Sequence, residues 1–202
     1  MIEYAINHPD KLWKPLLEHL EMLVVVMIIS ILLAAILTIA AMSSKIVSQI
    51  LIYLFSLVYS IPSLAIFAIL IPVMGLGKVT AISVLIVYNQ YVLLRNFIAG
   101  LNDIDPSILE AATGIGMSHM QVLFQIRLPL SIKALFTGIR LAVVSTIGMA
   151  TIAAFINAGG LGSLLYDGLR TMNVYKILWG SLLSAGLAIA ANALLIQIQK
   201  KI

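Results

Sequence analysis

The spacing of charges constrains the fold of this chain more than any other feature. Four long stretches carry no charged residue: 22–44, 46–77, 141–166 and 177–199. A helix needs about 20 residues to cross ~30 Å of hydrocarbon. Each stretch is therefore long enough for one crossing and too short for two. A fifth candidate, 79–101, is interrupted only by Arg95 near its end. The sequence thus predicts an all-α membrane protein with about five transmembrane helices.

Composition supports a bilayer as the solvent. Of the 202 residues, 62% are hydrophobic and 10% are charged, whereas a soluble domain is about 45–50% apolar and about 25% charged. A water-soluble fold of this size cannot bury so much apolar surface. The net charge of +4 includes no basic run, so positive residues at the edges of spans explain it better than a nucleic-acid partner does. Without cysteine, the chain has no disulfide and no cysteine-ligated metal site.

These patterns predict a single transmembrane domain over residues 1–202, with spans at about 22–43, 50–71, 79–101, 135–157 and 177–198. Apolar residues at helical spacing between Pro9 and Glu21 predict a helix that lies in the membrane interface, with a frayed polar tail as the alternative. Residues 1–21 are mixed and polar, so no cleaved leader is expected.

The distribution of lysine and arginine predicts the orientation. If residues 105–129 are cytoplasmic, seven basic residues lie inside and five outside. The inner set is Lys45, Arg95, Arg127, Lys133, Arg140, Lys200 and Lys201. By the positive-inside rule, we expect the N-terminus outside and the C-terminus in the cytoplasm of a multi-pass protein of a prokaryotic plasma membrane.

Polar and aromatic residues inside the spans are candidates for a solute path. Pro62 predicts a kink in the second span, which either lines a cavity beside Phe55 and Tyr59 or serves packing alone. A second group, Tyr88, Asn89, Gln90 and Tyr91, lies near the middle of the third span. Such groups are costly in a membrane unless they face protein or water, so they line a path or form interhelical hydrogen bonds. Similarly, Arg95 either extends to the headgroups or lines a water-filled path.

The longest polar interruption, residues 105–129, predicts two short helices. Asp105 can cap a helix that begins at Pro106 and runs through Ala112, after which Gly114 and Gly116 break it. Ser118 and Gln121 have the spacing of a capping box, so a second helix should run to about Ile126 and end at Leu128-Pro129. It would expose Met120, Leu123 and Phe124 to a partner's groove, unless the loop lies on the bilayer or these side chains pack against the chain's own spans.

Enzyme chemistry has little support in this sequence. The Gly-rich stretches 74–78 and 159–162 lack the spacing of nucleotide-binding loops. The three histidines are far apart and no nucleophile–base motif is present. We therefore expect no catalytic residue, no metal and no cofactor in this chain.

The interruption also carries a long gapped pattern: Glu110-Ala111-Ala112, three residues, Gly116, nine residues, Ile126, one residue, Leu128-Pro129. This pattern resembles the EAA signature of ABC importer permeases. The stretches 59–65 and 158–162 are similar to the branch that imports the quaternary-ammonium osmoprotectants glycine betaine, carnitine and choline. Methionine-importer permeases share the five-span plan and the loop, which leaves another small solute as the alternative.

The resemblance implies a type I ABC importer fold and a division of labour. Two permease subunits form the path, cytoplasmic ATPase subunits bind ATP and Mg²⁺, and an extracellular binding protein delivers the solute. The segment from Gly116 to Ile126 would dock in the ATPase, with Glu110 holding that interface. The implied coupling residues are Glu110, Ala111, Ala112, Gly116, Ser118, Met120, Leu123, Phe124, Ile126, Leu128 and Pro129.

A quaternary ammonium cannot donate hydrogen bonds and is held by aromatic faces. The residues expected near the solute are Phe55, Tyr59, Pro62, Tyr88, Asn89 and Tyr91. A stand-alone channel or secondary carrier would instead need intramembrane relays or an inverted repeat, and a membrane scaffold would not require the EAA spacing.

Overall fold

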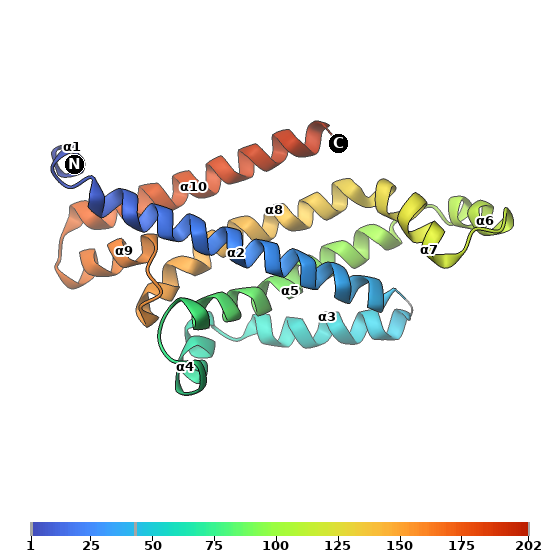
Figure 1. Ribbon diagram of the computed structural model, residues 1–202, viewed down its shortest axis with the longest axis horizontal. Helices are drawn as coiled ribbons and strands as arrows, with labels where there is room; N and C mark the ends of the chain where they lie inside the picture. Colours follow the sequence, from blue (N-terminus) through green and yellow to red (C-terminus); the bar gives the residue numbers. More distant parts are fainter. Residues whose placement is uncertain (1, 43, 202) are drawn as a thin grey trace.

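The computed structural model describes residues 2–42 and 44–201, and within them the chain forms helices and no strand. The helices make an elongated bundle (Figure 1). Four are long and apolar enough to cross a membrane: α2 (Asp10–Ala41), α5 (Lys78–Asn102), α8 (Leu128–Ile152) and α10 (Val174–Lys201). A fifth crossing is possible only if α3 (Lys45–Ser60) and α4 (Ser63–Met74) count as one broken span. The all-α membrane fold with about five spans is confirmed.

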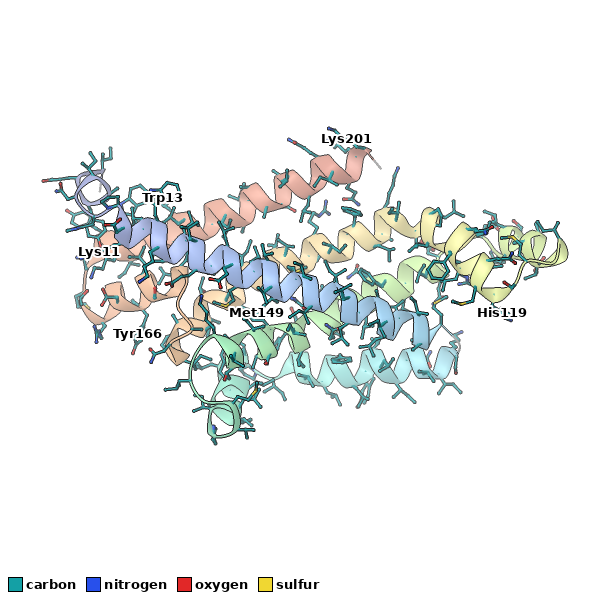
Figure 2. All side chains as sticks on the ribbon, in the orientation of Figure 1. Lys11, Trp13, His119, Met149, Tyr166 and Lys201 are labelled. Carbon is teal, nitrogen blue, oxygen red and sulfur yellow. The ribbon has the colours of Figure 1, made fainter. Side chains whose placement is uncertain are left out.

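The shorter helices mark the two ends of the bundle. At one end, called the loop end below, lie α6 (Pro106–Gly114), α7 (His119–Gln121) and the π-helix η1 (Val122–Arg127). At the opposite end lie α1 (Ile2–Asn7), α4, the 3-10 helix η2 (Ala153–Ile156) and α9 (Leu161–Arg170) (Figure 1). Lys11 and Trp13 accordingly lie far from His119 (Figure 2).

The segment expected to form a separate interfacial helix is instead continuous with the first span. α2 begins at Asp10 and runs for 32 residues to Ala41, a length of about 48 Å. No glycine or proline lies between Leu16 and Ala41, and adding a residue to an existing helix costs far less than nucleating a new one. The helix therefore extends through both segments.

The second span is broken rather than kinked. Instead of one helix over 50–71, α3 and α4 meet at an angle of 93° at Ile61-Pro62. A proline pushes the preceding residue to extended backbone, and Ile61 has φ −75° and ψ 134°. The Tyr88 hydroxyl on α5 donates a hydrogen bond to the Ile61 carbonyl. The break is thus held by a contact from α5.

α5 lies at the centre of the bundle, with α2, α3 and α8 around it (Figure 1). Its buried side chains join two apolar clusters, one with Phe67 and Leu85 and one nearer the loop end with Leu93 and Phe97. Small residues bring α5 and α8 close together: a Cβ on Gly100 would lie 2.6 Å from Ala134 Cβ. The halves of α5 and α8 near the loop end therefore form one tightly packed pair.

Candidate functional site

The first helix of the loop has caps at both ends. The Asp105 carboxylate accepts a hydrogen bond from Ser107 N–H at 2.8 Å, which confirms the expected N-cap. Hydrogen bonds from the Ser107 side chain and backbone hold the pKa of Asp105 below its usual value. α6 runs to Gly114, two residues past the expected end.

Gly116 makes the turn after α6 possible. Its φ is +86°, a conformation that costs other residues about 1–2 kcal/mol. Gly116 N–H bonds to the Thr113 carbonyl at 3.0 Å, and Met117 N–H bonds to the Ala112 carbonyl at 3.1 Å. These two bonds form a Schellman motif, which satisfies carbonyls at the end of the helix. The glycine of the signature is therefore required by the backbone.

The second helix begins as expected, at the capping box. Gln121 N–H bonds to Ser118 Oγ at 3.3 Å, and Ser118 N–H bonds to Gln121 Oε1 at 2.8 Å. The expectation that Leu128-Pro129 ends this helix is wrong. α7, η1 and α8 form one continuous helical segment.

The π-helix explains why Pro129 does not stop the segment. In an α-helix, the proline ring would clash with the carbonyl four residues earlier, here that of Gln125. The Leu128 N–H instead bonds to the Leu123 carbonyl, five residues back. This wider turn immediately before the proline lets the helix continue into α8. Helical π segments often occur at functional sites.

The loop exposes three apolar side chains, of which Met120 and Phe124 also line cavities beside α2. Ile115, Met120 and Phe124 are 81%, 56% and 50% exposed. Leu123, expected to be exposed with them, is buried and lines a cavity of about 510 Å³ with Ile39 of α2. Of the other signature residues, Ala112 is buried, Ile126 is half-buried, and Glu110, Ala111, Ser118, Leu128 and Pro129 are exposed.

Arg127 connects the loop to α5, a role that the sequence reasoning missed. Its Nη1 donates to the Leu101 carbonyl at 2.8 Å and to Asn102 Oδ1 at 3.3 Å. One turn later, Ser131 Oγ donates to the Gly100 carbonyl at 2.7 Å. Both side chains satisfy carbonyls at the end of α5 that have no intrahelical partner. The four-residue spacing of Arg127 and Ser131, on one helical face, was the available signal.

Three tyrosines meet where α3 breaks. The Tyr59 ring centroid lies 4.9 Å from that of Tyr91 and 5.6 Å from that of Tyr88. Tyr59 is 36% exposed, whereas Tyr88 is 3% exposed. Phe55 packs against the apolar cluster nearer the loop end, and Pro62 lies at the break. The structure thus brings Tyr59, Tyr88 and Tyr91 together and leaves Phe55 apart.

Asn89 forms hydrogen bonds to other helices, which was one of the two roles expected for the polar residues of the third span. Its Nδ2 donates to Thr146 Oγ1 of α8 at 2.9 Å and to Ser30 Oγ of α2 at 3.4 Å, and all three side chains are fully buried. Gln90 Nε2 also reaches α2, at the Ser30 carbonyl. This cluster joins three helices inside the bundle, so Asn89 does not lie on an exposed face.

One stripe of α5 stays exposed or half-exposed. It contains Val87, Tyr91, Arg95, Ala99 and Asn102, spaced by about one turn. Near the loop end the stripe borders a groove of about 450 Å³ between α5 and α8. The residues that line the groove include Asn96, Asn102, Asp103 and Thr137. A polar strip thus runs from the tyrosines toward the loop end.

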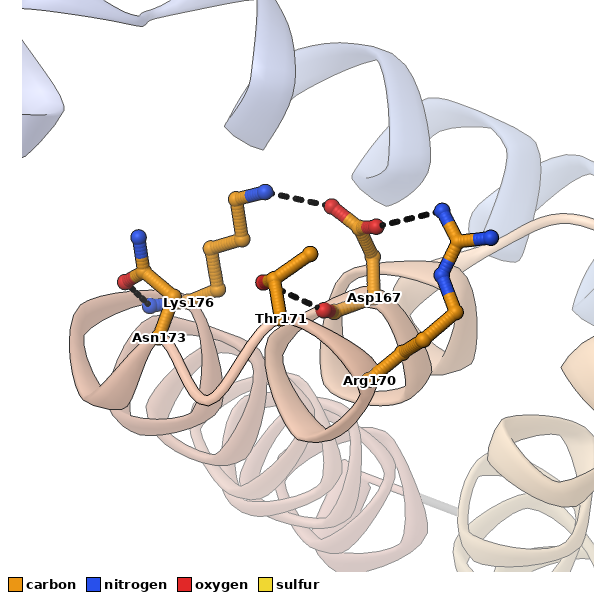
Figure 3. A network of polar contacts seen from close by, with 5 residues as sticks. All are labelled: Asp167, Arg170, Thr171, Asn173 and Lys176. Atoms are coloured by element: carbon orange, nitrogen blue, oxygen red, sulfur yellow. Dashed lines mark hydrogen bonds and ion pairs between the residues drawn. The ribbon is translucent and has the colours of Figure 1, made fainter.

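At the opposite end, α9 is fixed at both of its termini. Glu18 Oε2 and His19 Nδ1 of α2 accept hydrogen bonds from Gly160 and Leu161 N–H at its start. Near its end, Asp167 pairs with Lys176 and Arg170 (Figure 3). The hydrogen bond from Lys176, above all, holds the pKa of Asp167 below its usual value.

Residues 27–202 match the family described as "Binding-protein-dependent transport system inner membrane component". The chain belongs to this family. It is therefore the membrane-spanning permease component of an ABC importer. The family match agrees with the signature in the loop, which runs from α6 through α7 and η1 to the start of α8.

Two curated relatives extend over nearly the whole chain. The glycine betaine/carnitine/choline transport system permease protein OpuCB of Bacillus subtilis is 34% identical over 92% of this chain and 85% of its own length. The choline transport system permease protein OpuBB of the same organism is 30% identical over 100% of this chain and 93% of its own length.

Among solved structures, the MetNI methionine ABC transporter in an inward-facing conformation matches with a TM-score of 0.86 and 19% identity, over 96% of this chain and 97% of the other. An amino acid ABC transporter matches with a TM-score of 0.85 and 15% identity, over 100% and 99%. At this identity the likeness concerns the fold, and the expected type I importer fold is confirmed.

Proposed function

We propose that this permease carries a small quaternary-ammonium osmoprotectant, namely glycine betaine, carnitine or choline, into the cell. The relatives at 30% and 34% identity are named for these solutes and align over almost the entire chain. The solved structures named for methionine and other amino acids align equally far, but at only 19% and 15% identity. Sequence similarity therefore favours the osmoprotectants.

The tyrosine cluster is the observation that carries this proposal. A quaternary ammonium offers no N–H donor, so a protein holds it on aromatic faces. The ring centroids of Tyr59 and Tyr91 lie 4.9 Å apart, and Tyr59 is 36% exposed. We assign solute contact to these two rings. Tyr88, Asn89, Phe55 and Pro62 support the site by fixing the break of α3 and the packing of α5.

The loop serves as the docking element for an ATPase that binds ATP and Mg²⁺. Ile115, Met120 and Phe124 expose apolar side chains at the loop end, and exposed apolar groups of this kind can contact a partner. Glu110 is exposed on α6 of the same loop, with no ion-pair partner among residues 2–42 and 44–201. The loop end is then cytoplasmic, together with the C-terminus, and the N-terminus lies outside.

Two further partners complete the proposed importer. A second permease subunit, either another copy or a relative, faces the exposed stripe of α5 and closes the path. An extracellular binding protein delivers the solute at the end that carries α1, α4 and α9. A methionine-type importer is the alternative function, because MetNI shares the fold, with a TM-score of 0.86 at 19% identity, and the fold does not distinguish the solutes.

Reconstitution of the permease with its ATPase and binding protein tests the solute. Uptake of labelled glycine betaine, carnitine, choline and methionine into proteoliposomes is measured with and without ATP. ATP-dependent uptake of at least one quaternary-ammonium solute, at rates above methionine, supports the proposal. Uptake of methionine alone contradicts it.

Co-purification of the ATPase tests the loop. Glu110→Lys reverses a charge on the docking surface and should strongly reduce the amount of bound ATPase. Glu3→Lys makes the same change in α1, at the opposite end, and serves as the matched control. Equal retention of the ATPase by both variants would show that the loop is not the docking element.

A further inference from the structure

Arg95 is the only charged residue within the exposed stripe between Val87 and Asn102. It lies about two turns inside α5 from Asn102, at the level of the tyrosine cluster. An arginine at this depth is costly unless it meets water, protein or an anionic partner. The position therefore calls for a specific contact.

The contact that the structure gives is Tyr91. Arg95 Nη1 donates to the Tyr91 hydroxyl at 2.9 Å, and its guanidinium carbon lies 5.9 Å from the Tyr91 ring centroid. The ring is thus a cation–π partner as well as a hydrogen-bond acceptor. Tyr91 lies one turn before Arg95 on α5, on the side of the bundle away from the loop. The guanidinium is held beside the same ring that stacks on Tyr59.

Among residues 2–42 and 44–201, Arg95 has few hydrogen-bond partners. A guanidinium has five N–H donors, and the contact with Tyr91 takes one of them. Within the described ranges 2–42 and 44–201, ion pairs join Lys78 to Glu21 and join Arg170 and Lys176 to Asp167, and none includes Arg95. The free donors suit a planar, bidentate anion such as a carboxylate.

We propose that Arg95, Tyr59 and Tyr91 form a site for a zwitterionic solute, in which the aromatic rings hold the ammonium group and Arg95 binds the carboxylate. This inference rests on the proposed function and makes it more specific. Glycine betaine and carnitine carry both groups, whereas choline has a hydroxyl in place of the carboxylate. The site therefore selects solutes that carry a carboxylate.

Two structural features support the pairing of these groups in one site. Opposite charges on one small solute need an aromatic face and a cation close together, and Tyr91 contacts both Tyr59 and Arg95. The exposed stripe also continues from Arg95 through Ala99 to the groove at Asn102. A solute released from the site has a polar route toward the loop end.

The test compares two solutes in the complete complex of permease, ATPase and binding protein. Uptake of glycine betaine and of choline is measured for the wild type and for Arg95→Gln, and each solute is expressed as the ratio of variant to wild type. Because the binding protein is unchanged, its own preference cancels in this ratio. Loss of a charged hydrogen-bonded pair should lower glycine betaine uptake roughly 10- to 100-fold, with choline uptake reduced less than about threefold.

Two further variants separate this role from a structural one. Arg95→Lys keeps the charge and should recover part of the glycine betaine uptake. Lys45→Gln removes a positive charge at the start of α3, away from the stripe, and should leave both ratios near one. ATPase activity without solute is measured for every variant, so that a misfolded complex is recognised.

The outcomes separate the proposed role of Arg95 from the proposed osmoprotectant function on which it rests. Equal losses for both solutes, or no loss for either, overturn the carboxylate role of Arg95 and leave the osmoprotectant function standing. If the wild type imports methionine and no quaternary ammonium, the proposed solute class is wrong. Methionine uptake by Arg95→Gln then decides the role of Arg95: a strong loss retains the carboxylate contact, and unchanged uptake overturns it as well.

Discussion

Two exposed faces of this bundle differ in a way that hydropathy does not reveal. The exposed face of α2 is aliphatic, with Val24, Ile28, Leu32 and Ile36. The exposed stripe of α5 carries Tyr91, Arg95 and Asn102. Both helices are apolar enough to span a membrane. The difference is expected if α2 faces lipid while the stripe of α5 faces the proposed second permease subunit.

A new charge on each face gives the largest expected effect. Ile28→Arg places a guanidinium at an aliphatic, exposed position and should cost about 2.5–3.5 kcal/mol of insertion free energy. Ala99→Arg makes the same addition on the stripe and should insert with much less loss, while blocking uptake. Membrane-inserted protein and transport are measured for both variants. Equal insertion defects would remove the distinction between the two faces.

Arg127 tests whether the stripe is mechanically linked to the loop. Arg127→Gln removes the hydrogen bond to the Leu101 carbonyl and should lower solute uptake per ATP hydrolysed by roughly fivefold, within the usual range of coupling free energies. Arg140→Gln, which loses a bond to Gln199 of α10 instead, is the control. The ratio of uptake to hydrolysis is the measurement. An unchanged ratio in Arg127→Gln would mean that α5 moves independently of this contact.

Asn89 tests the interior that lies between the two faces. Asn89→Ala removes bonds to Thr146 and Ser30 and should destabilise the protein in detergent by about 0.6–2 kcal/mol. Asn96→Ala loses only a bond within α5, to the Val92 carbonyl, and should cost less. Thermal unfolding compares the two. A larger loss from Asn96→Ala would contradict the bracing role of the buried cluster.

The smallest expected effect is that of pH on stability through Asp167 of α9, which lies away from both faces. The pKa of Asp167 is lowered mainly by the hydrogen bond from Lys176, so the ionised carboxylate stabilises the folded state. This stabilisation is complete above the ordinary carboxyl pKa of 3.8 and is lost as pH falls through the lower folded value. Thermal unfolding between about pH 6 and pH 3 should show a steeper acid loss in the wild type than in Asp167→Asn. Parallel pH curves for the two proteins would show that the Asp167–Lys176 ion pair does not stabilise the folded state.

Local signals in the sequence were predictable because their causes are local. The N-cap at Asp105, the capping box at Ser118 and the glycine turn at Gly116 depend on residues within a few positions. The uncharged runs locate the spans for a similar reason, since each helix must match the bilayer by itself. The signature in the loop then identified the family, which the match over residues 27–202 shows.

Features that depend on neighbouring helices, or on a local departure from α-helical geometry, were missed. Pro62 predicted a kink, but the 93° break also depends on the contact from Tyr88. Pro129 was expected to end a helix because the proline rule assumes α-helical geometry, whereas a π turn precedes it. Tyr91 and Asn89 are two residues apart, yet one lies on the exposed stripe and the other is buried. Periodicity alone does not decide which face of a central helix is open.

The unbroken helical segment from His119 to Ile156 gives the molecule a lever. The segment bends before α8 (Figure 1), and α8 itself has 25 residues, a length of about 38 Å. If α8 moves as one body, each degree of tilt applied at Leu128 displaces Ile152 by about 0.7 Å. Under the proposed docking of an ATPase on the loop, small rotations there would displace side chains at the opposite end of the bundle.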